Sequence, residues 1–218
     1  ITGLKYEVPS TKLTTLNITD GSMLVLSGFT FDPDILTYNL LTKSSTVNIS
    51  YQEASANIDS TTVINGVGTD ISSSLTPLTL TTGNNAVIIT INSGFAGTSA
   101  TTYTININLD DVLPIISNLQ PVQDSFISNA NIGYELSEDL SSGKVKFINT
   151  TDSTEEEVDL TGTELSSGVR SLAALTNVLT LTHGKTYTIE INGTDLVGND
   201  SATASVTGLK YEVPSTKL

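Results

Sequence analysis

The stretch TYTININLDDVLP, residues 102–114, combines a strand signal with a domain boundary. Apolar residues alternate with Thr and Asn from Tyr103 to Asn108, which is the period-two pattern of a half-buried β-strand. Two carboxylates and a proline follow, at Asp110, Asp111 and Pro114. Because proline cannot occupy a central strand and stiffens a connection, we expect one domain to end here and another to begin.

The same alternation recurs along the chain, separated by turn signals such as Ser142-Gly143 and His183-Gly184. Short strands at such spacing are typical of antiparallel sandwiches, so the sequence predicts an all-β chain of two consecutive antiparallel Ig-like or cadherin-like β-sandwiches. Residues 164–176 fit either one helical face or a strand and loop. The other expected strands are 46–51, 86–91, 144–148, 187–191 and 202–206.

Composition limits the classes of partner. The 218 residues include nine Lys and Arg against 23 Asp and Glu, a formal net charge of −14 that opposes binding to nucleic acid. No apolar window of about 18 residues occurs, so we expect no membrane insertion. Cysteine is absent, which excludes disulfides and thiolate metal sites. An acidic surface suits solubility, the spacing of crowded copies, and divalent cations.

One sequence, TGLKYEVPSTKL, occurs twice, as Thr2–Leu13 and as Thr207–Leu218. Self-similarity at a fixed offset, here 205 residues, indicates a tandem repeat with a short overlap. The alternative is a duplicated terminal strand within a stand-alone protein. Each copy carries a proline in a short connection, so we expect tandem copies to form a semi-rigid rod.

Residues 14–109 resemble the cadherin-like β-sandwich of bacterial surface proteins. The motifs that carry this resemblance are Phe29–Pro33, Tyr38, Leu80–Asn85 and Thr102–Ile105. The resemblance implies a β-sandwich with an extracellular structural or adhesive role.

Residues 110–213 resemble the bacterial Ig-like repeats of very large surface and adhesin proteins, through Tyr134–Gly143, Leu160–Leu165, Thr186–Ile189 and Gly193–Asn199. In that family a segment like 206–213 closes the sandwich as its last strand. Residues 1–13 are then the last strand and linker of a preceding copy, and 214–218 begin the linker to the next. The strand Thr2–Val8 is expected to fray or to pair with the sheet edge of a neighbour. Both resemblances imply a bacterial cell surface.

Calcium at the internal domain junction, where it would stiffen the joint, is the sharpest site hypothesis. In an Ig-like sandwich, two loops and the start of the first strand lie at one end, and here these segments are rich in carboxylates. Calcium takes six to eight oxygen ligands, whereas the alternative role for such residues is to cap turns in solvent. The candidate ligands are Asp110, Asp111, Glu138, Asp139, Asp195, Asn199 and Asp200.

No catalytic constellation is evident, since His183 is the single histidine and lies in a turn context. We therefore expect a non-enzymatic structural repeat module of an extracellular fibre, stalk or surface-layer-like array, whose partners are neighbouring copies. One alternative is an adhesin module that binds carbohydrate or protein. Another is a filament subunit that polymerises by exchange of its terminal strand.

Overall fold

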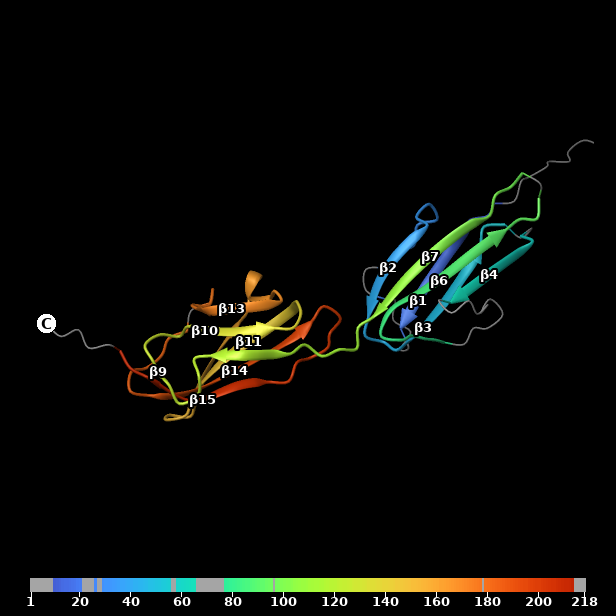
Figure 1. Ribbon diagram of the computed structural model, residues 1–218. Helices are drawn as coiled ribbons and strands as arrows, with labels where there is room; N and C mark the ends of the chain where they lie inside the picture. The colour runs from blue at the N-terminus through green and yellow to red at the C-terminus, as the bar shows by residue number, and fades with distance from the viewer. Residues whose placement is uncertain are drawn as a thin grey trace, which may run out of the picture. The chain divides into compact units, whose positions relative to one another are not determined.

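The computed structural model describes residues 10–20, 26, 29–55, 58–65, 77–95, 97–177 and 179–213. It divides into two compact units, residues 1–111 and 112–218. Both units consist of β-strands, and the described residues contain no α-helix (Figure 1). None of those residues forms a helix with the length and apolar character needed to cross a membrane. The predicted all-β fold is confirmed.

The first unit contains two sheets, which enclose one hydrophobic core (Figure 1). One sheet has the order β1-β3-β5 and the other the order β2-β7-β6-β4. The strand bounds are β1 Leu13–Asp20, β2 Thr37–Thr42, β3 Thr46–Glu53, β4 Ser60–Asn65, β5 Leu78–Thr79, β6 Gly83–Asn92 and β7 Thr101–Leu109.

Strand β7 organises the first unit. It pairs along its length with β6 on one side and with β2 on the other, antiparallel and parallel respectively. Its apolar positions point inward as the alternation predicts, because Tyr103, Ile105 and Ile107 are fully buried while the residues between them are not. Burial of such side chains stabilises a unit by about 1.5–3 kcal/mol each.

The second unit also contains two sheets around its own core. Their orders are β13-β10-β8 and β12-β11-β14-β15-β9. The bounds are β8 Ile116–Gln120, β9 Phe126–Ile127, β10 Ile132–Leu136, β11 Leu140–Asn149, β12 Thr154–Asp159, β13 Gly168–Ala173, β14 Thr186–Asp195 and β15 Ala204–Tyr211, with a short 3₁₀ helix η1 at Gly162–Leu165.

Two local expectations can now be compared with the structure. The turn expected at Ser142-Gly143 is wrong, because both residues lie inside β11. Gly143 pairs with Gly193 of β14, and a Cβ on Gly143 would lie 2.9 Å from Leu160 Cδ1. The glycine therefore makes room for a core leucine instead of bending the chain. Residues 164–176 form the end of η1, a strand and a loop, so the helical alternative is wrong.

Candidate functional site

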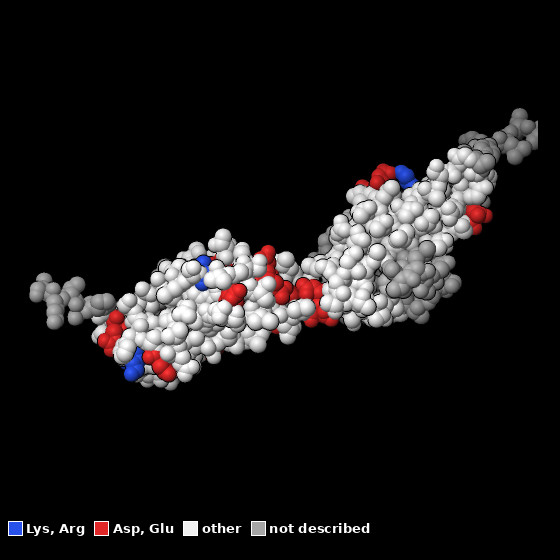
Figure 2. Space-filling model, in the orientation of Figure 1, with Lys and Arg blue, Asp and Glu red and all other residues white. Residues whose placement is uncertain are grey.

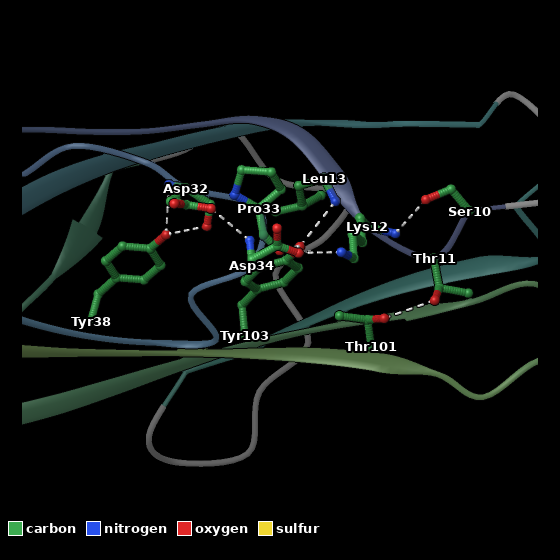
Figure 3. Close-up of polar contacts among 10 residues, drawn as sticks. All are labelled: Ser10, Thr11, Lys12, Leu13, Asp32, Pro33, Asp34, Tyr38, Thr101 and Tyr103. Atoms are coloured by element: carbon green, nitrogen blue, oxygen red, sulfur yellow. Dashed lines mark hydrogen bonds and ion pairs between the residues drawn. The ribbon is translucent and has the colours of Figure 1, made fainter.

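The end of the N-terminal copy of TGLKYEVPSTKL is docked on the first unit (Figure 3). The Oγ1 atoms of Thr11 and Thr101 lie 2.7 Å apart and share a hydrogen bond. Thr11 Oγ1 also donates to Ser99 O, 3.2 Å away. Lys12 Nζ forms an ion pair with Asp34, which raises the pKa of Lys12 through the hydrogen bond to that carboxylate. Exposed pairs of this kind contribute little to stability.

Leu13 makes the strongest of these attachments, because its side chain is 1% exposed and enters the core. Its backbone N–H donates to Tyr103 Oη at 3.2 Å, and the same hydroxyl donates to Pro33 O at 3.0 Å (Figure 3). A second hydroxyl, Tyr38 Oη, donates to Asp32 O at 2.6 Å. Two tyrosines therefore hold the Asp32–Asp34 turn and the start of β1 in one arrangement.

The beginning of the C-terminal copy of TGLKYEVPSTKL occupies a different place, in the second unit. Thr207–Tyr211 form the last part of β15, beyond an irregularity in its pairing with β14. Leu209 is fully buried in the second core. Gly208 has a φ of +74°, and a Cβ there would lie 2.0 Å from Asp124 Oδ1. The position therefore requires glycine for both its conformation and its space.

Backbone hydrogen bonds hold the C-terminal copy on both sides. Toward β14, Tyr211 N donates to Lys185 O at 2.9 Å. Toward β9, Lys210 N donates to Ser125 O at 3.0 Å and Glu212 N donates to Ile127 O at 2.9 Å. His183 lies in a turn as expected, and its Nδ1 accepts a hydrogen bond of 3.0 Å from Val213 N. Together these bonds extend the docking to residue 213.

Among the candidate calcium ligands, Asp195 is the most buried, at 1% exposure. Its Oδ1 accepts hydrogen bonds of 2.8 Å from the N–H groups of Val197 and Asn199, and its Oδ2 accepts one of 2.8 Å from Asn199 Nδ2. Burial alone raises the pKa of Asp195, but these hydrogen bonds outweigh it and lower the pKa. Asp195 thus stabilises the loop between β14 and β15 in its ionised form.

Besides Asn199, the second unit brings Glu138 close to Asp195, since a carboxylate oxygen of Glu138 lies within 4.8 Å of one of Asp195. Asp139 instead accepts a 2.7 Å hydrogen bond from Ser167 N, which lowers its pKa. Asp200 accepts one of 2.7 Å from Thr194 Oγ1. Asp110 and Asp111 belong to the first unit, where Asp111 accepts a hydrogen bond of 2.9 Å from Thr82 Oγ1.

Sequence reasoning missed Glu164, a carboxylate 2% exposed in the second unit. Its Oε2 accepts a bond of 2.8 Å from Thr161 N and its Oε1 one of 2.7 Å from Thr176 N. Arg170 Nη2 lies 3.4 Å from Oε1. Burial raises the pKa of Glu164, yet the backbone hydrogen bonds lower it by more. The signal was present as Thr and Glu three residues apart, the spacing of a capping box.

Charged side chains elsewhere are sparse. On the face shown in Figure 2, Asp and Glu form small separate groups on a mainly uncharged surface, with few Lys or Arg side chains. At the β12 edge, Glu155 and Glu157 pair with Lys146 and Lys144 across the strands. The second unit also has a pocket of about 300 Å³, lined by Ser128, Asn129, Ala130, Asn131, Ala174, Leu175, Asn177, Leu179, Leu181 and Tyr211.

Comparison with known families identifies one of the two units. Residues 12–109 match the family model of the cadherin-like beta sandwich domain. The first unit therefore fits a cadherin-like β-sandwich domain. The residues that dock Thr11–Leu13 therefore belong to this cadherin-like domain. The assignment of the second unit to the bacterial Ig-like repeats stays a prediction.

Solved structures offer a more distant likeness. The chain is similar to the fibronectin(III)-like modules of Clostridium thermocellum CbhA, at 15% sequence identity and a TM-score of 0.35. That similarity covers 87% of this chain and 96% of the other. No match was found among curated proteins.

Proposed function

We propose that the two sandwiches form one 205-residue repeat of an extracellular bacterial array, which is a fibre, stalk or surface layer. Each repeat would add to the length of the array and set the spacing between its parts, and it would catalyse no reaction. The observation that carries this proposal is that TGLKYEVPSTKL has a docking place in each unit. Its first part closes the second unit as the end of β15, and its last part opens the first unit as the start of β1. One stretch therefore carries the residues that end one copy and begin the next.

The two docked parts also define the joint between copies. Among the residues that the structure describes, the last docked position in the second unit is Val213, which corresponds to Val8, and the first in the first unit is Thr11. Only Pro9 and Ser10 lie between those positions. A tether of two residues that includes a proline allows little bending. Successive copies would then hold a restricted orientation.

The cadherin-like domain supports the extracellular and structural parts of the proposal, since cadherin-like domains are typically extracellular and non-catalytic. The acidic composition is consistent with this, because copies that carry a net charge of −14 repel one another and stay apart. The neighbouring copies are the proposed partners. An adhesin role has no comparable support, since the pocket in the second unit has a single aromatic residue, Tyr211, in its lining.

The array itself is tested by the reading frame on either side of this segment, where further copies of TGLKYEVPSTKL are expected at intervals of 205 residues. Flanks without any such copy contradict the array. The stiffness of the joint is tested with a protein of two consecutive copies. The chain has no cysteine, so single cysteines carry spin labels without background.

The labels replace two exposed residues, Val169 in the first copy and the equivalent of Leu41 in the second copy. Pulsed electron spin resonance should then give a narrow distribution of distances between the labels. The matched control inserts about ten Gly and Ser residues after Pro214, which converts the tether into a flexible coil. If the natural joint gives a distribution as broad as this control, the semi-rigid array is refuted.

We also propose that calcium stiffens the acidic end of the second unit. Support comes from the approach of the Glu138 and Asp195 carboxylates, because two such charges repel each other unless a cation lies between them. Carboxylate and backbone oxygens are the ligands calcium prefers, and extracellular modules bind it at about 10⁻⁴–10⁻³ M. The other five candidate ligands stay predictions.

The calcium proposal predicts a higher melting temperature in millimolar calcium than in chelator. Glu138→Gln should abolish this shift, whereas Asp159→Asn, at an exposed carboxylate of β12, should preserve it. If the melting temperature of the unsubstituted chain is the same in calcium and in chelator, the calcium proposal is refuted. The proposal of a tandem array does not depend on that result.

A further inference from the structure

The end of β15 occupies a site in the second unit that a second segment of the same sequence could also occupy. Three features define this place, which we call the β15 slot: Leu209 fully buried, Gly208 without room for a side chain, and hydrogen bonds to both neighbouring strands. Few sequences meet all three requirements. The segment Thr2–Val8 meets each of them, because it is identical to Thr207–Val213.

We propose that the β15 slot accepts Thr2–Val8 of a second copy of this chain. Leu4 would take the place of Leu209, and Gly3 that of Gly208. The donor segment itself lies outside the described residues, so the slot is defined by its natural occupant. This step goes beyond the proposed array, because it concerns a copy whose Thr2–Val8 segment is not already part of a preceding copy, and it joins separate chains without a peptide bond between them.

The pairing of β15 with β14 indicates which part of β15 the donor segment could replace. Its register shifts between the pairs Tyr187–Leu209 and Ile189–Val206. The repeated residues, Thr207 onward, lie beyond this shift, and the part that is not repeated, Ala204–Val206, lies before it. The repeated part can therefore leave the slot while the rest of β15 stays paired. Ile1 aligns with Val206, which continues the match with a similar β-branched side chain.

The slot also provides the backbone partners that strand addition needs. On the β9 side, Asp124 N donates to Thr207 O and Lys210 N donates to Ser125 O, both at 3.0 Å. On the β14 side, Gly184 N donates to Tyr211 O at 2.8 Å. These bonds involve only the backbone of the occupant, so a second copy of the segment would form them equally well.

Own and foreign segments compete for the slot. The chain's own segment is tethered beside it, which gives it a high effective concentration, so the unsubstituted chain should be monomeric when dilute. Because donor and slot are different surfaces, exchange is heterologous and generates chains or rings of molecules. Weakening only the C-terminal segment should reveal this exchange.

The experiment uses four proteins of 218 residues: the unsubstituted chain, Leu209→Asp, Leu4→Asp, and the double variant. Aspartate in place of Leu209 puts a carboxylate into an apolar core, which expels the chain's own segment. We expect Leu209→Asp to form concentration-dependent oligomers, with a weight-average molar mass at least twice that of the monomer in light scattering. Leu4→Asp should stay monomeric, and the double variant should be monomeric with hydrogen exchange increased in the second unit.

A synthetic peptide of residues 1–10 separates specific exchange from aggregation. It should return the Leu209→Asp oligomers to monomers and restore protection of β14, whereas the same peptide with Leu4→Asp should do neither. Identical behaviour of Leu209→Asp and the double variant overturns the proposal. A monomeric Leu209→Asp variant whose second unit stays protected from hydrogen exchange also overturns the proposal, because Thr2–Val8 would then fill the β15 slot of its own chain.

Discussion

Glu164→Gln removes one charge from the interior of the second unit and keeps the shape of the side chain. The carboxylate accepts backbone hydrogen bonds from Thr161 and Thr176 at 2.8 and 2.7 Å, one on each oxygen. Glutamine offers only one acceptor oxygen, so one of these two N–H groups must face an NH₂ group. A hydrogen bond to a charged group contributes about 1.5–3 kcal/mol, and a buried donor without an acceptor costs about 1–3 kcal/mol. Since these two terms overlap, we expect the unfolding free energy of the second unit to fall by about 3 kcal/mol.

The effect should also depend on pH. The pKa of Glu164 is lowered from its ordinary value of 4.5, because hydrogen bonds from Thr176 and Thr161 favour the ionised form more than burial disfavours it. A lowered pKa contributes stability that is present above the pKa of the unfolded chain and is lost as the pH falls through the folded pKa. The difference between the unsubstituted chain and Glu164→Gln should therefore be constant above about pH 6 and should shrink below pH 4.5.

Urea unfolding followed by pulsed hydrogen exchange and mass spectrometry measures this difference. Peptides from the two units report their transitions separately, which a single spectroscopic signal from a two-unit chain does not. The control is Glu212→Gln at an exposed position, where no comparable loss is expected. A loss below about 1 kcal/mol for Glu164→Gln, or a loss that does not change with pH, refutes the reasoning.

Four further substitutions probe the docking contacts and the second core. Tyr103→Phe removes the hydroxyl that bonds to Leu13 N and Pro33 O, so the unfolding free energy of the first unit should fall by about 1–3 kcal/mol, and an unchanged exchange rate at the start of β1 counts against this attachment. A residue other than glycine in the left-handed conformation costs about 1–2 kcal/mol. Gly208→Ala should destabilise the second unit by more than this, because the added Cβ would also clash with the Asp124 carboxylate. Gly3→Ala, in the identical sequence, should change neither unit, and equal effects of the two variants contradict the assignment of the slot. Burial raises the pKa of Tyr134 to about 12, so the stability of the second unit should decline above pH 10 and Tyr134→Phe should remove that part of the decline in alkaline unfolding curves.

Local patterns in the sequence predicted the strands well, because alternation reflects which side of one strand is buried. Every apolar position from Tyr103 to Ile107 is buried as the alternation indicated. Pairing between distant segments was not predictable in the same way. Nothing in Thr37–Thr42 shows that this segment pairs in parallel with Thr104–Leu109, since that arrangement depends on the path of the whole chain.

The candidate sites show a second limit of sequence reasoning. The carboxylate of Asp195 has the sequence context of a cation ligand, and the structure shows that it also accepts hydrogen bonds from its own loop. Both roles use an aspartate in a turn, so residue type and spacing do not separate them. Gly143 gave a turn signal for the same kind of reason, because glycine serves tight packing as well as sharp bends.

The parallel ladder between β2 and β7 has a mechanical consequence for a chain held under tension. Tension on the connection after Leu109 acts along the axis of β7, which is bonded to β2 on one side and to β6 on the other. Such a force loads the hydrogen bonds of both ladders in shear, so they must break together and not one after another. Resistance of this kind depends on the rate of unfolding and not on equilibrium stability. For the proposed array, this predicts that the first unit unfolds slowly under a steady pull even where its folding free energy is modest.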